Sequence, residues 1–447
     1  MKPLIVIQGP VATRSGYGNH TRDLALALIK ADKYDVRLVS LPWGACPMNA
    51  LEQGNDDHDL LFKRIITSQL EKQPDVFIQV SVPHEFQKIG KYNIGITAGI
   101  ETTICSASWL EGCNRMDEII VTSEHSKDVF MKTVYDKVDE KTKQKVGESL
   151  KLTTNIDVLF EGCDTKLYYK TNEIHQSVVS ELSSIKEKFC FLFVGHWLQG
   201  DFGQDRKDVG MMIKTLCETF KNKPSRTRPA LILKTSGAGF SIMDRELILD
   251  KIRQIVEPYG GSAINIYVLH GDLTDAEMNS LYNHPKIKTM ISFTKGEGFG
   301  RPLLEFTMTG KPVIASNWSG QLDFLHAEYS SLLPGKLTPV HKSAHMKEMV
   351  IDGSHWFTVD YAYASQVLKD VHDNYKLYDI RGKKQRTHSL ENFTLEHMNE
   401  KFVGMIDKCL STVPQAASLK LPKLKKLGSD ASSAPKLKLP KLTKVTT

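Results

Sequence analysis

The chain has 447 residues, of which 41% are hydrophobic and 25% are charged, as is typical of a globular protein with ample material for a core. This length exceeds what one hydrophobic core usually holds, so it predicts two domains and excludes a small stapled module. The seven Cys are widely scattered without a C-x-x-C pair, which argues against a disulfide framework and a zinc site.

The positive charge is concentrated in one segment. The whole chain carries a formal charge of +6, whereas residues 418–447 contain eight Lys and a single Asp. The rest is therefore close to neutral, which excludes a nucleic-acid-coating surface there and assigns any attraction to a polyanion or an anionic membrane surface to the tail. The first apolar run, residues 4–7, is too short for a signal peptide, and no uncharged run could span a bilayer. We expect a cytoplasmic location, either free or peripheral at a membrane surface.

The first part of the chain alternates short β-branched runs with longer helical patterns, as βαβ units of a parallel sheet do. A strand at 4–7 precedes a loop rich in Gly and Ser and a helix at 19–29. Further buried strands are expected at 76–80, 93–96, 118–122 and 157–162.

The same alternation restarts after a polar stretch at 163–172, where we place a domain boundary. The strands expected in the second part are 189–195, 230–234, 264–269, 289–293 and 312–315. We predict an α/β protein with two Rossmann-like doubly wound domains facing a central cleft at the carboxyl ends of their strands. The predicted segments are a first Rossmann-like domain at 1–168, a second at 169–385, a helix packing back across the domains at 386–412 and a tail at 413–447.

The tail differs in kind from the rest of the chain. The run LKLPKL at 419–424 recurs at 437–442 after a Gly- and Ser-containing spacer. Regular Pro and clustered Lys oppose helix formation, which predicts a disordered basic arm. This arm contains no aromatic residue, so it offers no platform for stacking on bases.

Two carboxylates, Glu297 and Glu305, flank a glycine-containing turn directly after the strand expected at 289–293. Pro302 suits the first position of a helix, and glycines before it let backbone N–H groups approach a ligand closely. A helix N-terminus favours an anion by roughly 0.3–2 kcal/mol. Acceptors on both sides of an anion site fit a diphosphate with hydroxyls at each end, which is a sugar nucleotide.

The segment 293–319, with its E-x(7)-E motif and the following TGKPVIA, resembles the retaining glycosyltransferases of group 1, family four, which have the GT-B architecture. The resemblance extends to the runs FVG at 193–195, RK at 206–207, EGCDT at 161–165, SGYG at 15–18 and VTSEHSK at 121–127. It covers roughly residues 1–410, excludes the tail, and implies that 1–168 is the acceptor-side domain and 169–385 the nucleotide-sugar donor domain.

This resemblance implies roles for the residues of the motif. Glu297 would contact the hydroxyls of the donor sugar, and Glu305 would contact the ribose of the nucleotide. Backbone donors to the sugar and phosphates would come from Gly298, Phe299 and Gly300.

The resemblance also implies two cations that clamp the diphosphate. Lys207 would be one of them. The family usually places an Arg directly after the glycine that ends the first strand of the second domain, but this chain has His196 there. We therefore assign the second cation to Arg206.

In the first domain, Gly16 and Gly18 follow the first strand and are expected to lie near the donor. They could equally be plain turn glycines. The family often has a His near the transferred sugar, and two strand-end residues, His84 and Glu101, are candidates for that place.

The resulting hypothesis is a hexosyl- or related glycosyltransferase that moves a sugar from a nucleoside-diphosphate sugar to a hydroxyl acceptor with retention. The sugar nucleotide is a co-substrate, and no cofactor or metal is expected; the single D-x-D, at 57–59, is interpreted as a solvated loop. A glycan, a lipid or a modified nucleic acid could each be the acceptor. The alternative is an inactive GT-B scaffold that binds nucleotide sugar or glycan and docks partners through its basic tail.

Overall fold

In a computed structural model, which describes residues 2–44, 46–139, 142, 144–237 and 241–412, the chain forms two six-stranded sheets and two small two-stranded sheets. The predicted tail at 413–447 lies outside the described residues. All neighbouring strands in both large sheets are parallel. The predicted fold class, two Rossmann-like α/β domains, is confirmed.

The first sheet draws on residues from both ends of the chain for its core. Its strands in spatial order are β2 (Asp35–Ser40), β1 (Leu4–Gly9), β3 (Val76–Val80), β4 (Tyr92–Thr97), β5 (Glu118–Val121) and β8 (Asn155–Val158). Its helices are α1 (Gly16–Lys30), α2 (Asp56–Phe62), α3 (Ala107–Cys113) and α4 (Glu124–Lys132), and a short hairpin joins β6 (Val134–Tyr135) to β7 (Leu150–Lys151). One face buries α1 with a helix from the end of the chain, and the other buries α3 and α4.

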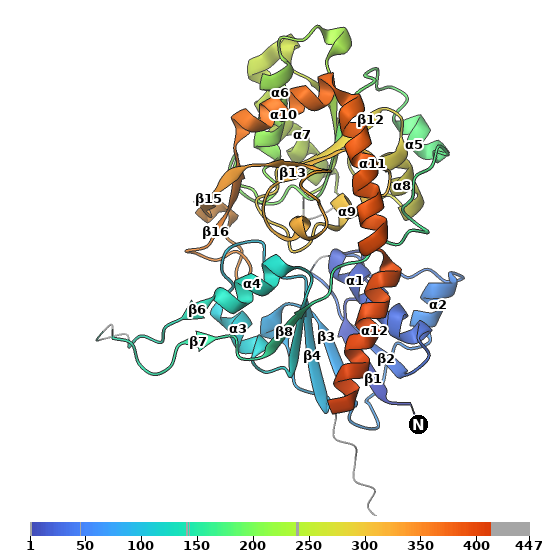
Figure 1. Cartoon of the computed structure of the whole chain (residues 1–447), viewed down its shortest axis with the longest axis vertical. Coiled ribbons are helices and arrows are strands. Elements are labelled where there is room, and N and C mark those ends of the chain that lie inside the picture. Colours follow the sequence, from blue (N-terminus) through green and yellow to red (C-terminus); the bar gives the residue numbers. More distant parts are fainter. Residues whose placement is uncertain (1, 45, 140–141, 143, 238–240, 413–447) are drawn as a thin grey trace, which may run out of the picture. The chain divides into compact units, whose positions relative to one another are not determined.

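The second sheet has helices on both faces because its strand side chains alternate between two cores. Its strands in spatial order are β11 (Asn265–Leu269), β10 (Ala230–Lys234), β9 (Cys190–Val194), β12 (Ile287–Ser292), β13 (Val313–Ser316) and β14 (Ser331–Leu333). Phe191 and Phe193 face α6 (Val209–Phe220), α7 (Ile242–Val256) and α10 (Tyr361–Asp373), as Figure 1 shows for the helices. Cys190 and Leu192 face α5 (Gln176–Glu181), α8 (Asp275–Asn283) and α9 (Arg301–Thr307).

Two long helices follow the second sheet. In α11 (Tyr375–Asn392), the Gln385 amide donates to the Phe324 carbonyl at 2.8 Å, so this helix packs on the second sheet. In α12 (Leu395–Thr412), Met398, Phe402 and Ile406 pack in the core of the first sheet. The chain therefore returns to the first sheet between these helices, at the Phe393–Thr394 step (Figure 1). Short 3-10 turns occupy Pro83–Glu85, Ser225–Thr227, Glu257–Ser262, Gly320–Asp323 and Lys342–Ala344.

Each strand predicted from an apolar run is present within a few residues of its expected position. The edge strands β2 and β14 were not predicted from the sequence, and neither were the antiparallel pairs β6–β7 and β15 (Gly335–Pro339) with β16 (His355–Val359). The interpretation of 57–59 as a loop is wrong, because these residues lie in α2. The Asn55 side chain caps that helix by accepting from the N–H groups of Asp57 and His58, and carboxylates are favourable in a first helical turn.

Among the described residues, no helix combines the length and the apolar character that a membrane crossing needs. The last strand of the first sheet ends at Val158 and the first strand of the second begins at Cys190. Tyr168, at the end of the segment assigned to the first domain, packs in a core of the second sheet and donates to Asp275 at 2.7 Å.

Candidate active site

The predicted site residues of the second domain lie in two loops that leave neighbouring strands, except Glu305, which lies in α9. The chain runs from β9 through β10 to the edge strand β11 and then returns to β12 on the other side of β9. Strand order reverses there, which is where ligands bind in doubly wound sheets. The loop after β9 carries Arg206 and Lys207, and the loop after β12 carries Glu297.

These loops bring four charged groups together. The Lys207 ammonium contacts one oxygen of the Glu297 carboxylate, and the Arg206 Nη1 atom lies 3.2 Å from the other. The same Nη1 lies 2.9 Å from Glu101 Oε1, in the loop after β4 of the first sheet. The structure therefore places Glu297, Lys207, Arg206 and Glu101 in one cluster, which we call the cation–carboxylate cluster.

Burial and charge act in opposite directions on this cluster. Burial alone would raise the pKa of Glu297, but the charges of Lys207 and Arg206 outweigh it and bring that pKa below its ordinary value. Burial raises the pKa of Glu101 and lowers the pKa of Lys207. Burial would also lower the pKa of Arg206, but Glu101 and Glu297 outweigh it and raise that pKa. Glu297 is therefore ionised near neutral pH and holds both cations in place.

The turn after Glu297 has a geometry that needs glycine. Gly300 has φ of +103° and precedes the first residue of α9, and a Cβ on Gly298 would lie 2.0 Å from the Ala98 carbonyl oxygen. The Phe299 ring is buried against Phe324, with ring centroids 5.0 Å apart. Within the described residues, the backbone N–H groups of positions 298–300 have no protein acceptor. This turn therefore requires its glycines, and its backbone N–H groups are free of protein acceptors among the described residues.

Glu305 lies in a second, more buried cluster. It accepts from the Tyr282 hydroxyl at 3.2 Å and from Arg301 Nε at 3.3 Å. Arg301 also reaches Asp23 of α1, with 2.7 Å between Nη1 and Oδ2. Burial raises the pKa of Glu305 and that of the nearby Glu161 to about 7.

Arg301, Glu161 and Asp23 of this second cluster were not among the predicted site residues. Arg301 and Glu161 both occur within the quoted family-like runs, so their position in those motifs was the available signal. Asp23 had none, because it lies in an ordinary amphipathic helix and meets Arg301 only in the folded chain.

The remaining candidates of the first domain are separated by the fold. Gly16 begins α1 and is exposed, with open space where a Cβ would project. Gly18 is buried, and a Cβ there would lie 2.3 Å from the Thr13 carbonyl oxygen, so close packing explains it. His84 is exposed in the 3-10 turn after β3, where its carbonyl accepts from Arg115 at 2.8 Å. Within the described residues, His84 makes no hydrogen bond or ion pair with the cation–carboxylate cluster, whereas Glu101 belongs to it.

His196, at the place where the resemblance expects Arg, is exposed as a whole residue, with one side of its ring against the loop after β10. Its Nδ1 atom lies 3.0 Å from the Ser236 hydroxyl. Burial, followed by the charges of Lys207 and Arg206, lowers its pKa. A neutral imidazole therefore lies near the two cations, and Arg206 supplies the second positive charge of the cluster.

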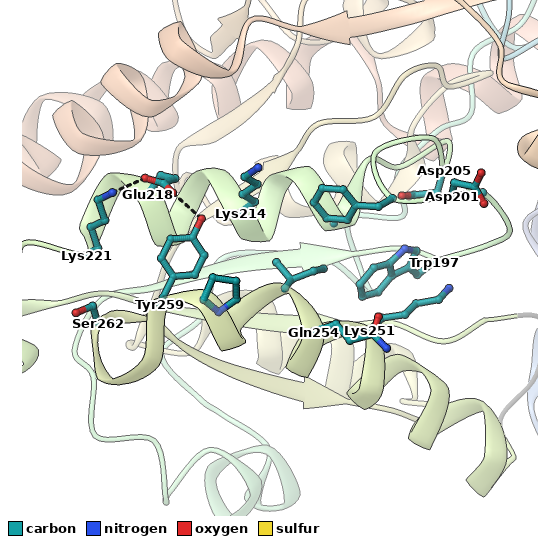
Figure 2. Close-up of a pocket in the computed structure, with 15 residues that line it drawn as sticks. Trp197, Asp201, Asp205, Lys214, Glu218, Lys221, Lys251, Gln254, Tyr259 and Ser262 are labelled. Atoms are coloured by element: carbon teal, nitrogen blue, oxygen red, sulfur yellow. Dashed lines mark hydrogen bonds and ion pairs between the residues drawn. The ribbon is translucent and has the colours of Figure 1, made fainter.

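Two of the cavities in the described part of the second domain lie beside its sheet. One, of about 320 Å³, opens at the carboxyl ends of β10 and β11 and is lined by Lys234 and the 268–273 segment. The other, of about 800 Å³, lies between α6 and α7. Figure 2 shows its wall, where Tyr259 donates to Glu218 and Lys251 lies 5.1 Å from the centre of the Trp197 ring. None of the predicted site residues lines this larger cavity.

In the part of the chain that the structure describes, no group of three or more His, Cys, Asp or Glu residues could hold a metal ion.

No protein-family model and no curated protein matches the sequence. Solved structures do match. Sucrose-phosphate synthase from Thermosynechococcus elongatus superimposes with a TM-score of 0.60 at 14% identity, covering 92% of this chain and 100% of that one. Anabaena HepE in complex with UDP and glucose gives 0.58 at 12% identity, covering 91% and 100%. A glycosyltransferase from Rickettsia africae gives 0.58 at 14% identity, covering 92% and 99%.

The chain thus has the fold of these enzymes along nearly its whole described length. The predicted GT-B arrangement of two Rossmann-like domains is confirmed.

Proposed function

We propose that this protein is a retaining glycosyltransferase that uses a nucleoside-diphosphate sugar as donor and a hydroxyl compound as acceptor. One observation carries the proposal. Lys207 and Arg206 pair with Glu297 where strand order reverses, beside a glycine turn whose backbone N–H groups have no protein acceptor among the described residues. Two cations and free N–H groups are what a departing diphosphate requires, because charge develops on it as the glycosidic bond breaks.

The proposed assignment of groups follows from the contacts. Lys207 exchanges Glu297 for a phosphate oxygen when the donor binds, and Glu297 then accepts from hydroxyls of the sugar. Arg206 keeps its bond to Glu101, so that carboxylate stays at the side of the transferred sugar. Glu305, inside α9, accepts from the ribose after giving up one of its present donors.

The cavity at the ends of β10 and β11 is the proposed place of the nucleoside. It opens at the same edge of the sheet as Lys207, and its volume of about 320 Å³ lies at the lower end of the range for small-molecule sites.

The proposed reaction balances without a protein nucleophile. The bond between the anomeric carbon and the diphosphate oxygen breaks, a bond from the acceptor oxygen forms on the same face, and the acceptor proton passes to the departing phosphate. Retention and independence of metal rest on the family resemblance.

The test measures release of nucleoside diphosphate from a panel of nucleoside-diphosphate sugars, without acceptor or added metal. UDP-glucose is the first donor to try, because a structure with this fold contains UDP and glucose. Glu297→Ala is expected to abolish release while the far-ultraviolet circular dichroism spectrum stays unchanged. Glu400→Ala, on the exposed face of α12, is the matched control and should release at the wild-type rate. Equal release from Glu297→Ala and wild type would refute the proposal.

Binding without release, across broad donor and acceptor panels, would instead favour the inactive scaffold. The specific reason to test for an inactive scaffold is that this chain has His196 where the family usually has Arg.

For the basic tail we propose contact with a polyanionic acceptor or an anionic membrane surface. Removing residues 418–447 deletes a net charge of +7. The truncated protein should bind anionic vesicles or DNA more weakly and with a flatter dependence on salt, since that dependence reflects the number of phosphates neutralised. Identical binding at all salt concentrations would show that the tail has no such role.

A further inference from the structure

Lys295 is a charged residue in the core of the second domain. It is 1% exposed, and only two residues separate it from the end of β12. Its Nζ atom lies 3.3 Å from Asp208 Oδ2, donates to the Thr358 hydroxyl at 3.1 Å and lies 5.8 Å from the centre of the Trp356 ring. Because burying an ammonium is costly, these contacts must hold it firmly.

Its partner Asp208 has an unusual backbone. Asp208 is 0% exposed and has φ of +52° and ψ of +36°, a left-handed conformation that residues other than Gly rarely adopt. Its Oδ2 atom also accepts from the Tyr361 hydroxyl at 2.7 Å. Its Oδ1 atom is buried without a hydrogen-bond partner in the described part of the chain. Its side-chain contacts therefore maintain a strained backbone directly after Lys207.

The ion pair joins the same two loops that the cation–carboxylate cluster joins, with the charges exchanged. On the cleft side, Lys207 of the first loop pairs with Glu297 of the second. In the core, Asp208 of the first loop pairs with Lys295 of the second. A backbone hydrogen bond from Lys295 N–H to the Arg206 carbonyl, at 2.7 Å, lies between the two pairs.

The two pairs differ in what a ligand can do to them. The side chains of Lys207 and Glu297 are 13% and 10% exposed, whereas those of Lys295 and Asp208 are 2% and 0% exposed. A diphosphate can compete for Lys207, but no ligand reaches Lys295. The inner pair therefore keeps the loops in register when the outer pair opens.

We propose that the buried Lys295–Asp208 ion pair is a positioning device that fixes Lys207 relative to Glu297 during transfer. The inference rests on the proposed function for its catalytic meaning. Neither residue of the pair touches substrate; they act through the two loops.

The test uses Lys295→Met, the milder Asp208→Asn and the double variant. Asn tolerates the left-handed backbone and keeps the shape of Asp, so this variant should fold even if Lys295→Met does not. Each single variant is expected to lower kcat for donor cleavage roughly 10- to 100-fold, as small misplacements of catalytic groups do. Donor Kd should change by less than about threefold, because ground-state binding depends less on this geometry.

The double variant separates positioning from plain stability. It removes both buried charges, so its thermal stability should recover relative to the single variants. Its kcat should remain low. Recovery of kcat together with stability would overturn the proposal. Lys286→Met is the matched control. Lys286 directly precedes β12, and its ammonium donates to the carbonyls of Leu182 and Ile185 rather than to either loop of the site. Its loss should leave kcat unchanged.

A second readout needs no turnover. Lys207 should react with an amine-labelling reagent several times faster in each single variant than in wild type, as followed by peptide mass spectrometry. If wild type neither binds nor cleaves any nucleotide sugar, the proposed function fails, and this labelling alone decides the positioning role. Labelling at the wild-type rate in folded variants would overturn it.

Discussion

Glu161 is one of the buried carboxyls that make the stability of this protein depend on pH, and Glu161→Gln should remove its share of that dependence. Glu161 is only 8% exposed, and its carboxyl lies near Arg301 and Asp23. Burial raises the pKa of this carboxyl from 4.5 to about 7. Between these pH values the folded chain holds a proton that the unfolded chain has released. Stability must therefore fall as pH rises through this window.

The size of the effect follows from the pKa values. Each pH unit costs about 1.4 kcal/mol, so about 3 kcal/mol is lost between pH 4.5 and 7. Gln resembles the protonated carboxyl and never ionises. The variant should therefore match the wild type near pH 4.5 and exceed its stability by about 3 kcal/mol at pH 8.

The assay is urea unfolding at half-unit steps from pH 5 to 8, followed by tryptophan fluorescence. The difference in unfolding free energy between variant and wild type should grow up to about pH 7 and then level. Glu400→Gln, at an exposed position, should show no such growth. A constant difference between Glu161→Gln and wild type across the range would refute this reasoning about burial.

Three further predictions concern packing and roles at the site. Gly18→Ala should destabilise the protein by about 1–3 kcal/mol through overpacking against Thr13, whereas Gly16→Ala, which meets open space, should not lower its melting temperature. Arg301→Met should cost about 3–5 kcal/mol in urea unfolding, because it leaves buried carboxylates without their partner; a loss below 1 kcal/mol would contradict this. Glu101→Gln should lower kcat for donor cleavage while His84→Ala should not, and the reverse pattern would show that the sugar lies elsewhere.

The strands were predictable where burial on both faces requires a continuous apolar run. Residues 76–80 and 230–234 are such runs, and both coincide with the observed strands. The edge strand β2 exposes Arg37 and carries polar residues at both ends, and β14 has three residues, so neither gives that signal. Asn55 is a favourable N-cap residue, and it indicated a helix at 56–62 even though residues 57–59 are polar.

The local motifs contained the parts of the candidate site that are close in sequence. Glu297 and the glycine turn could be selected because the turn itself requires glycine. The pairing of Arg206 with Glu101 and Glu297 could not be predicted in the same way. Glu297 and Arg206 are 91 positions apart in the sequence, and they come together only because β9 and β12 are neighbours in the sheet. The same reason hides the Asp23–Arg301 contact, which spans 278 positions.

If the cation–carboxylate cluster is the donor site, its cation Lys207 should contribute to donor binding. The direct test is calorimetric titration of wild type and Lys207→Met with UDP-glucose and the other common nucleoside-diphosphate sugars. Wild type should bind at least one donor, and Lys207→Met should bind that donor at least about tenfold more weakly, since a charge-assisted hydrogen bond contributes about 1.5–3 kcal/mol. Equal affinity in a folded Lys207→Met variant, or no binding of any donor to wild type, would contradict the claim.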